Sequence, residues 1–147
     1  MANSETLRDL IRINNDRVTG YSKAATQTDE QDLQSLFSQL AQQSRQFASD
    51  LRRLVSDDKN VTDETTASGK IYRAWMDVKT TFTGKDRTSL LESCEAGEDA
   101  AQRAYKDAME TEGLPAEIRD FIGQQKKALR VSHDEIKAMR DWQKATS

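Results

Sequence analysis

Four long segments of the sequence carry apolar residues at steps of three and four, and a polar residue interrupts each stripe near its middle. Such steps place side chains on one face of an α-helix. Four such faces can be buried only against one another, which predicts an all-α bundle with Asn14, Gln43, Glu98 and either Gln125 or His133 at a similar depth. The stripes are Leu7, Leu10, Ile11, Asn14, Val18 and Tyr21; Leu33, Leu36, Phe37, Leu40, Gln43, Phe47, Leu51 and Leu54; Leu91, Cys94, Glu98, Ala101, Tyr105 and Ala108; and Ile118, Phe121, Ile122, Gln125, Leu129, His133, Ile136 and Met139.

The composition fits slender helices with wide solvated faces. The 147 residues are 35% hydrophobic and 32% charged, and one proline with six glycines is too little turn chemistry for a β-rich fold. This length suits a single domain over residues 1–147. The net charge is −3 with both signs interspersed, which favours neither nucleic acid nor an anionic membrane as a partner.

The ends of the expected helices predict the topology. We expect helices from about Ser4 to Ala25, Thr28 to Val55, Asp86 to Glu112 and Pro115 to Lys144, with a shorter amphipathic helix from Lys70 to Phe82 in the second connection. The first and last turns are short and make antiparallel hairpins, whereas about 30 residues separate the hairpins. One long crossover between two helical hairpins is the ferritin-like arrangement.

Several local signals accompany these helices. Thr28-x-x-Gln31 has the pattern of a capping box, and Asp86 could cap the third long helix. Cys94 lies on an apolar stripe, so we expect a small core residue and no disulfide. The first residues lack the pattern of a signal peptide, and no segment is apolar enough to span a bilayer, so we expect a cytoplasmic protein.

The centre of such a bundle is where di-iron and di-manganese proteins bind their metals. That site needs a Glu from each of two helices and a Glu-x-x-His pair from each of the other two. Weak candidate ligands are Glu95, Glu98 and His133, but Arg130 stands three residues before His133, and Arg45 would repel a cation. We therefore predict no tightly bound metal, no cofactor and no catalytic residues; the alternative is an atypical iron or manganese site.

A buried polar layer is the other interpretation of these residues. An inward-facing Glu98 or Glu95 would need a cationic partner, because an unpaired buried carboxylate is costly. Arg45 or Arg17 could provide it, and we expect an ionised Glu98 (or, one turn earlier, Glu95) paired with Arg45. The predicted layer contains Asn14, Arg17, Gln43, Arg45, Glu95, Glu98 and Gln125. Glu92, Glu95, Glu98 and Asp99 also form an acidic ridge along the third long helix, and the other interpretation of these four residues is a solvated face.

Five segments of the chain carry a resemblance to known sequences: Leu10–Arg17, Ala41–Ala48, Arg73–Asp77, Glu92–Ala100 and His133–Lys137. In this order they resemble a bacterial family of ferritin-like four-helix-bundle proteins of unknown function. The resemblance covers nearly the whole chain and implies a ferritin-like fold and a bacterial cytosolic protein, but no activity.

Three classes of function remain open from the sequence. The first is a non-enzymatic interaction or stress-related protein that meets a protein partner, or itself, through its solvated faces or the Trp75 segment. The second is a ferritin-like metal-binding or oxidoreductase protein with an atypical carboxylate and histidine site. The third is a small-molecule binder that uses the polar layer as a pocket.

Overall fold

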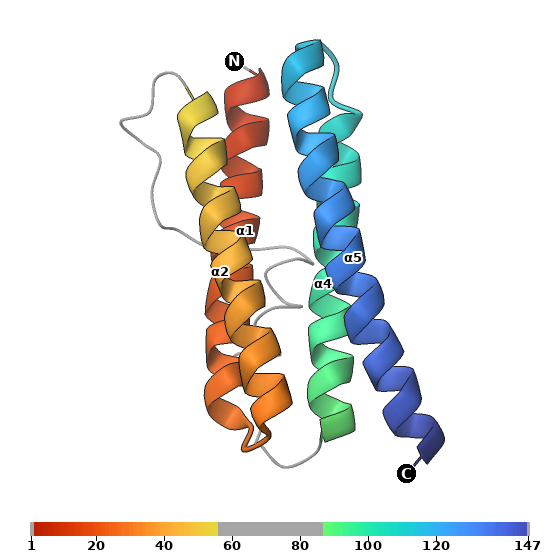
Figure 1. The fold of residues 1–147 in the computed structure, drawn as a ribbon. Coiled ribbons are helices and arrows are strands. Elements are labelled where there is room, and N and C mark those ends of the chain that lie inside the picture. The colour runs from red at the N-terminus through yellow and green to blue at the C-terminus, as the bar shows by residue number, and fades with distance from the viewer. Residues whose placement is uncertain (1, 56–86, 147) are drawn as a thin grey trace.

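The computed structural model describes residues 2–55 and 87–146, and these residues form four helices without a strand (Figure 1). The helices are α1 (Ala2–Gln27), α2 (Gln31–Leu54), α4 (Arg87–Met109) and α5 (Ala116–Thr146). The predicted all-α fold is thus confirmed for these residues. The short helix expected at Lys70 to Phe82, with Trp75, and the expected cap at Asp86 lie outside the described residues.

Contacts at the helix ends define the direction of each helix. Arg87, at the start of α4, pairs with Glu30 and Asp32 at the start of α2, so these two helices are parallel. The hydroxyls of Thr6 and Thr111 are 3.5 Å apart, which places the start of α1 beside the end of α4. The end of α2 and the start of α4 therefore lie at opposite ends of the bundle (Figure 1).

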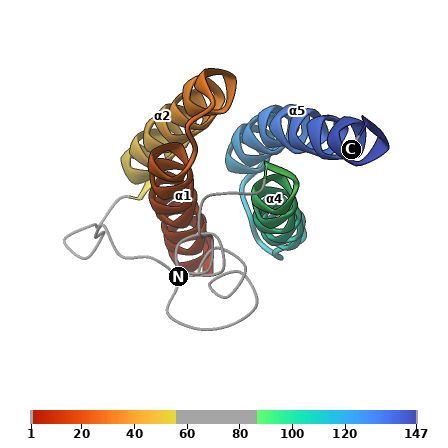
Figure 2. The same cartoon turned by 90° about the horizontal axis from the view of Figure 1, so that it is seen from below.

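The four helices occupy the corners of a bundle made from two hairpins. α1 packs along α2 and α4 packs along α5, while α1 also contacts α4 and α5 contacts α2. α2 and α4 are diagonal, without backbone contact between them. Figure 2 shows the two hairpins side by side, with the C-terminal end of α5 diverging from α2. No helix in residues 2–55 and 87–146 is long and apolar enough to cross a membrane.

Two apolar clusters fill the bundle, and a polar layer separates them. One cluster gathers Leu7, Leu10, Leu51, Tyr105 and Ile122 near the start of α1. The other contains residues near the turn between α1 and α2. Its members include Tyr21, Phe37, Leu91, Cys94 and Ile136. Each helix thus contributes apolar residues to both clusters, and the polar residue in the middle of its stripe lies between them. The interrupted stripes predict this arrangement.

The turns within the two hairpins follow from local chemistry. The expected capping box is wrong, because α2 begins at Gln31 and the Thr28 hydroxyl instead accepts the Glu30 backbone N–H at 3.2 Å. Gly113 has a φ of 78°, a left-handed conformation that side chains disfavour, and it reverses the chain between α4 and α5. Pro115 directly precedes α5, and its carbonyl accepts the Arg119 N–H at 2.9 Å.

Candidate functional site: a buried ion pair and a carboxylate–histidine cluster

An ion pair between Arg17 and Glu98 occupies the centre of the bundle. Nη2 of Arg17 donates to Oε2 of Glu98 at 2.6 Å, and both side chains are 0% exposed. The hydroxyl of Tyr21 donates to the same carboxylate oxygen. Nη1 of Arg17 donates to the Ser44 hydroxyl and to Oε1 of Gln43, the latter at 3.2 Å. Residues from α1, α2 and α4 thus meet around one charge-neutral pair.

Helical spacing brings the two donors together. Arg17 and Tyr21 are four residues apart on α1, so they lie one turn apart on the same face. The guanidinium carbon of Arg17 is 5.3 Å from the Tyr21 ring centroid, within the range of a cation–π contact. The same turn therefore provides both donors to Glu98 and an aromatic face for the guanidinium.

The surroundings shift the pKa values of these donors upward. Burial opposes the charged form of Arg17, but the charge and hydrogen bond of Glu98, together with the two neighbouring tyrosines, raise the pKa of the guanidinium above its ordinary value. Burial, followed by the negative charge of Glu98, raises the pKa of the Tyr21 phenol well above its ordinary value. Arg17 stays charged and Tyr21 stays a neutral donor at physiological pH.

A second buried network lies beside the ion pair. Nδ2 of Asn14 donates to the Tyr105 hydroxyl at 2.8 Å, and that hydroxyl donates to Oε1 of Gln125 at 2.6 Å. Nε2 of Gln125 reaches the backbone carbonyl of Phe47 at 3.4 Å. This chain of hydrogen bonds links all four helices.

The expected pairing of Arg45 with Glu98 is wrong. Arg45 is exposed on α2 and donates to Oε1 of Gln42 at 3.3 Å, while Arg17 pairs with Glu98. Arg45 follows Gln43 by two residues, about 200° around the helix, so it faces away from the interior. Of the other residues expected in the layer, Asn14, Arg17, Glu98 and Gln125 are buried, and Gln43 and Glu95 are half-buried.

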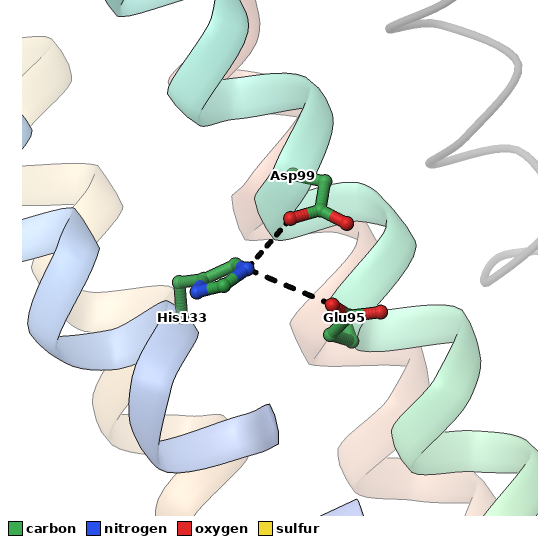
Figure 3. A group of neighbouring side chains, drawn as sticks. All are labelled: Glu95, Asp99 and His133. Atoms are coloured by element: carbon green, nitrogen blue, oxygen red, sulfur yellow. Dashed lines mark hydrogen bonds and ion pairs between the residues drawn. The ribbon is translucent and has the colours of Figure 1, made fainter. Parts of the chain in front are cut away.

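Glu95, Asp99 and His133 form a separate cluster between α4 and α5 (Figure 3). Nε2 of His133 lies 2.6 Å from Oδ1 of Asp99 and 3.6 Å from Oε2 of Glu95. One ligand atom from each residue lies within 4.8 Å of the other two. Glu95 and Asp99 are four residues apart on α4, which directs both carboxylates towards the same side chain of α5.

Charged neighbours surround this cluster. Nδ1 of His133 is 3.0 Å from Oδ1 of Asp134, and Nη1 of Arg140 donates to Oε1 of Glu95 at 3.0 Å. Burial opposes protonation of His133, but hydrogen bonds to Asp134 and Asp99 raise its pKa overall. Burial raises the pKa of Glu95, and the negative charge of Asp99 raises it further. The cluster is thus an imidazole facing two close carboxylates.

The structure brings two of the three expected metal-ligand candidates together. Glu95 and His133 meet, but Glu98 faces the bundle centre, and Asp99 takes the third position. Glu98 and Asp99 are successive residues, about 100° apart around α4, so they cannot share one target. The expected solvated ridge is likewise wrong for Glu98, which is fully buried.

Several polar residues of the two central networks are not evident from the sequence pattern. Ser44 and Ser132 are buried small residues, and Ser132 donates to Oε1 of Gln43 at 3.3 Å. Tyr21 and Tyr105 lie on the apolar stripes, yet their hydroxyls join the two central networks. The four-residue spacing of Glu95 and Asp99 was the signal that could have identified the second acid of the cluster.

Comparisons with known proteins identify a family without a described activity. Residues 2–111 match a family described as a domain of unknown function, DUF2383. No curated protein matches the chain significantly. The matched range covers α1, α2 and α4, and therefore both partners of the central ion pair. On this match, the chain belongs to the DUF2383 family.

Proposed function

We propose that this protein is a ferritin-like helical bundle that has an ion pair in place of a di-metal centre and acts through protein contacts rather than catalysis. The observation that carries the proposal is the fully buried contact between Arg17 and Glu98. A guanidinium at this position provides the positive charge that metal ions would provide in a di-metal protein. Four carboxylates are needed to neutralise two divalent cations, and Arg17 opposes such a charge distribution.

The arrangement of the helices supports the ferritin-like part of the proposal. The two hairpins have short turns, α2 and α4 are parallel and diagonal, and the chain resumes at the opposite end of the bundle after α2. A single lengthwise crossover is the simplest connection with this geometry. The bacterial and cytoplasmic setting belongs to the same proposal and rests on the sequence resemblance.

An exposed apolar pair on α5 supports a role in protein contacts. Val131 and Trp142 are each 68% exposed. They are eleven residues apart, close to three helical turns, so they lie along one face of α5. Exposed tryptophan is common among residues that contribute most to protein interfaces. We propose self-association through this face; partners other than protein are not favoured by a net charge of −3 with interspersed signs.

Metal analysis of protein purified without chelator tests the first part. We expect the centre to bind no iron or manganese, and to bind none after growth with excess of either metal. The variant Asp99→Asn serves as the control, because it removes a carboxylate from the cluster of Glu95, Asp99 and His133, hereafter the outer cluster, and leaves the centre intact. About two iron or manganese ions per chain in both proteins would contradict the proposal and favour the metal-binding or oxidoreductase alternative.

Sedimentation velocity over a range of concentrations tests the second part. We expect the wild-type protein to form a species heavier than one chain, and Trp142→Gln to shift this equilibrium towards single chains. Lys137→Gln is a matched control, because it changes another exposed position of α5. A wild-type protein that remains a single chain at every concentration would contradict self-association.

A further inference from the structure

We propose that Glu95, Asp99 and His133 bind one divalent transition-metal ion between α4 and α5, outside the bundle centre, and that zinc is the best match. This inference does not depend on the proposed function, because the outer cluster and the central ion pair use different residues. The three side chains converge from two helices in Figure 3. They provide one imidazole nitrogen and two carboxylate oxygens.

The distances between the donor atoms are close to those of a metal site. Two ligand atoms bound tetrahedrally to zinc, at bonds of about 2.0–2.1 Å, lie roughly 3.3 Å apart. Here Nε2 of His133 lies 2.6 Å from Asp99 and 3.6 Å from Glu95. To surround an ion, Nε2 and the Asp99 oxygen would have to move apart by about 0.7 Å, and Nε2 and the Glu95 oxygen would have to approach by about 0.3 Å.

The orientation of the His133 ring also supports metal binding. Its Nδ1 contacts Oδ1 of Asp134 at 3.0 Å, so Nε2 is the nitrogen that faces Glu95 and Asp99. Metal-binding histidines in proteins usually donate their other ring N–H to a carboxylate or carbonyl, which fixes the ring and its tautomer. His133 is also buried, with 7% of its surface exposed, so α4 and α5 restrain the ring.

The charged groups around the outer cluster are compatible with a bound cation. Arg140 contacts Oε1 of Glu95, while Oε2 of the same carboxylate faces His133. Asp99 is 40% exposed on its side chain, which leaves an approach from solvent and a fourth position for water. Without an ion, the 2.6 Å contact needs a proton between Nε2 and Asp99; zinc binding releases that proton to solvent and forms the Nε2–zinc bond.

The donor set selects the class of metal. Calcium and magnesium prefer sets made entirely of oxygen donors, whereas an imidazole suits zinc and other first-row transition ions. Three protein ligands with an open fourth position are typical of zinc sites that bind a water. A single ion at this site would bridge α4 and α5, the hairpin that carries the exposed Trp142.

Zinc titration of the full-length protein tests the proposal. His133 is the only histidine, so NMR of protein labelled with ¹⁵N-histidine reports on this ring alone. We expect saturation at one zinc per chain, a shift of the Nε2 resonance, and retention of the Nδ1–H signal. Competition with a zinc-binding dye should show affinity at least tenfold lower in Asp99→Asn and in Glu95→Gln.

Asp107→Asn is the matched control, because it removes an exposed carboxylate from the same helix, two turns away, and should leave zinc affinity unchanged. Excess magnesium should not displace the bound zinc. The absence of saturable zinc binding would overturn the proposal. So would zinc binding that leaves the His133 resonances in place, since the cluster would then be an ion-pair network only. The NMR measurement uses wild-type protein, so a poorly folded variant cannot obscure the result.

Discussion

Arg17 and Glu98 are 81 positions apart in the sequence and form a 2.6 Å ion pair from which solvent is excluded. The second oxygen of the carboxylate, Oε1, is buried without a hydrogen-bond partner among the described residues. Buried ion pairs add little net stability, because desolvation offsets much of the attraction between the charges. The pair instead fixes how α1 and α4 align, because any other alignment would leave two charges buried and unpaired.

The losses of stability caused by replacing Arg17 and by replacing Glu98 should be far from additive. We expect Arg17→Met or Glu98→Gln alone to lower the free energy of unfolding by about 3–5 kcal/mol, because each strands a buried polar or charged group. The double variant should lose much less than the sum of the two single losses. Denaturant unfolding of the four proteins gives the coupling energy directly.

Arg45→Met is the control for this cycle. Arg45 is exposed, so its replacement should change the free energy of unfolding by less than about 0.5 kcal/mol. A coupling energy near zero between Arg17 and Glu98 would contradict the buried ion pair.

Tyr105→Phe should destabilise the second network. The change removes one hydroxyl, which leaves Oε1 of Gln125 without its buried donor and leaves Nδ2 of Asn14 with the Leu10 carbonyl as its remaining acceptor. A buried polar group that loses its partner costs about 1–3 kcal/mol. Thermal or denaturant unfolding measures the loss, and a further change of Gln125→Leu should restore part of it. Equal stability of Tyr105→Phe and wild type would mean that water replaces the hydroxyl.

Stability should fall at alkaline pH because of the two central tyrosines. Burial raises the pKa of Tyr21 and of Tyr105, so both remain protonated in the folded protein after they ionise in the unfolded chain, near pH 10. Their contribution is fully present below about pH 10 and is lost as pH rises further, by about 1.4 kcal/mol per pH unit for each tyrosine. Denaturant unfolding at a series of pH values measures this slope.

Phenylalanine variants separate the contribution of the two tyrosines from that of Cys94, whose pKa is also raised by burial. Tyr21→Phe and Tyr105→Phe should each show a shallower loss of stability above about pH 10 than the wild type. The same slope in all three proteins would contradict the assignment.

Gly113→Ala should weaken the hairpin between α4 and α5. The added Cβ would meet no atom within 4 Å, so the cost comes only from the backbone, whose φ is 78°. A left-handed conformation costs a residue with a side chain about 1–2 kcal/mol relative to glycine. Denaturant unfolding checks the loss, and Gly113→Asn should lose less, because asparagine tolerates this conformation better. An unchanged stability of Gly113→Ala would mean that the turn adopts another conformation.

The periodicity of the sequence determined the helices and the layer that divides their core. The stripes of α1 and α2 place Leu10, Asn14, Phe37 and Gln43 on the interior faces, and the structure places these residues buried or half-buried. This outcome follows because a helix turns by a fixed angle per residue, so spacing alone tells which residues share a face. The short turns likewise followed from the spacing between stripes.

The partner of each charged residue depended on the tertiary structure. Helical spacing places Arg17 on the face of Asn14 and turns Arg45 away from Gln43, but the packing of α1 against α4 decided that Arg17 pairs with Glu98. The register between α4 and α5 gave His133 two partners, Asp99 and Glu95, and left Glu98 to the centre. Sequence spacing fixes angles within one helix, whereas contacts between helices depend on rotation and sliding that are set by packing of the entire core.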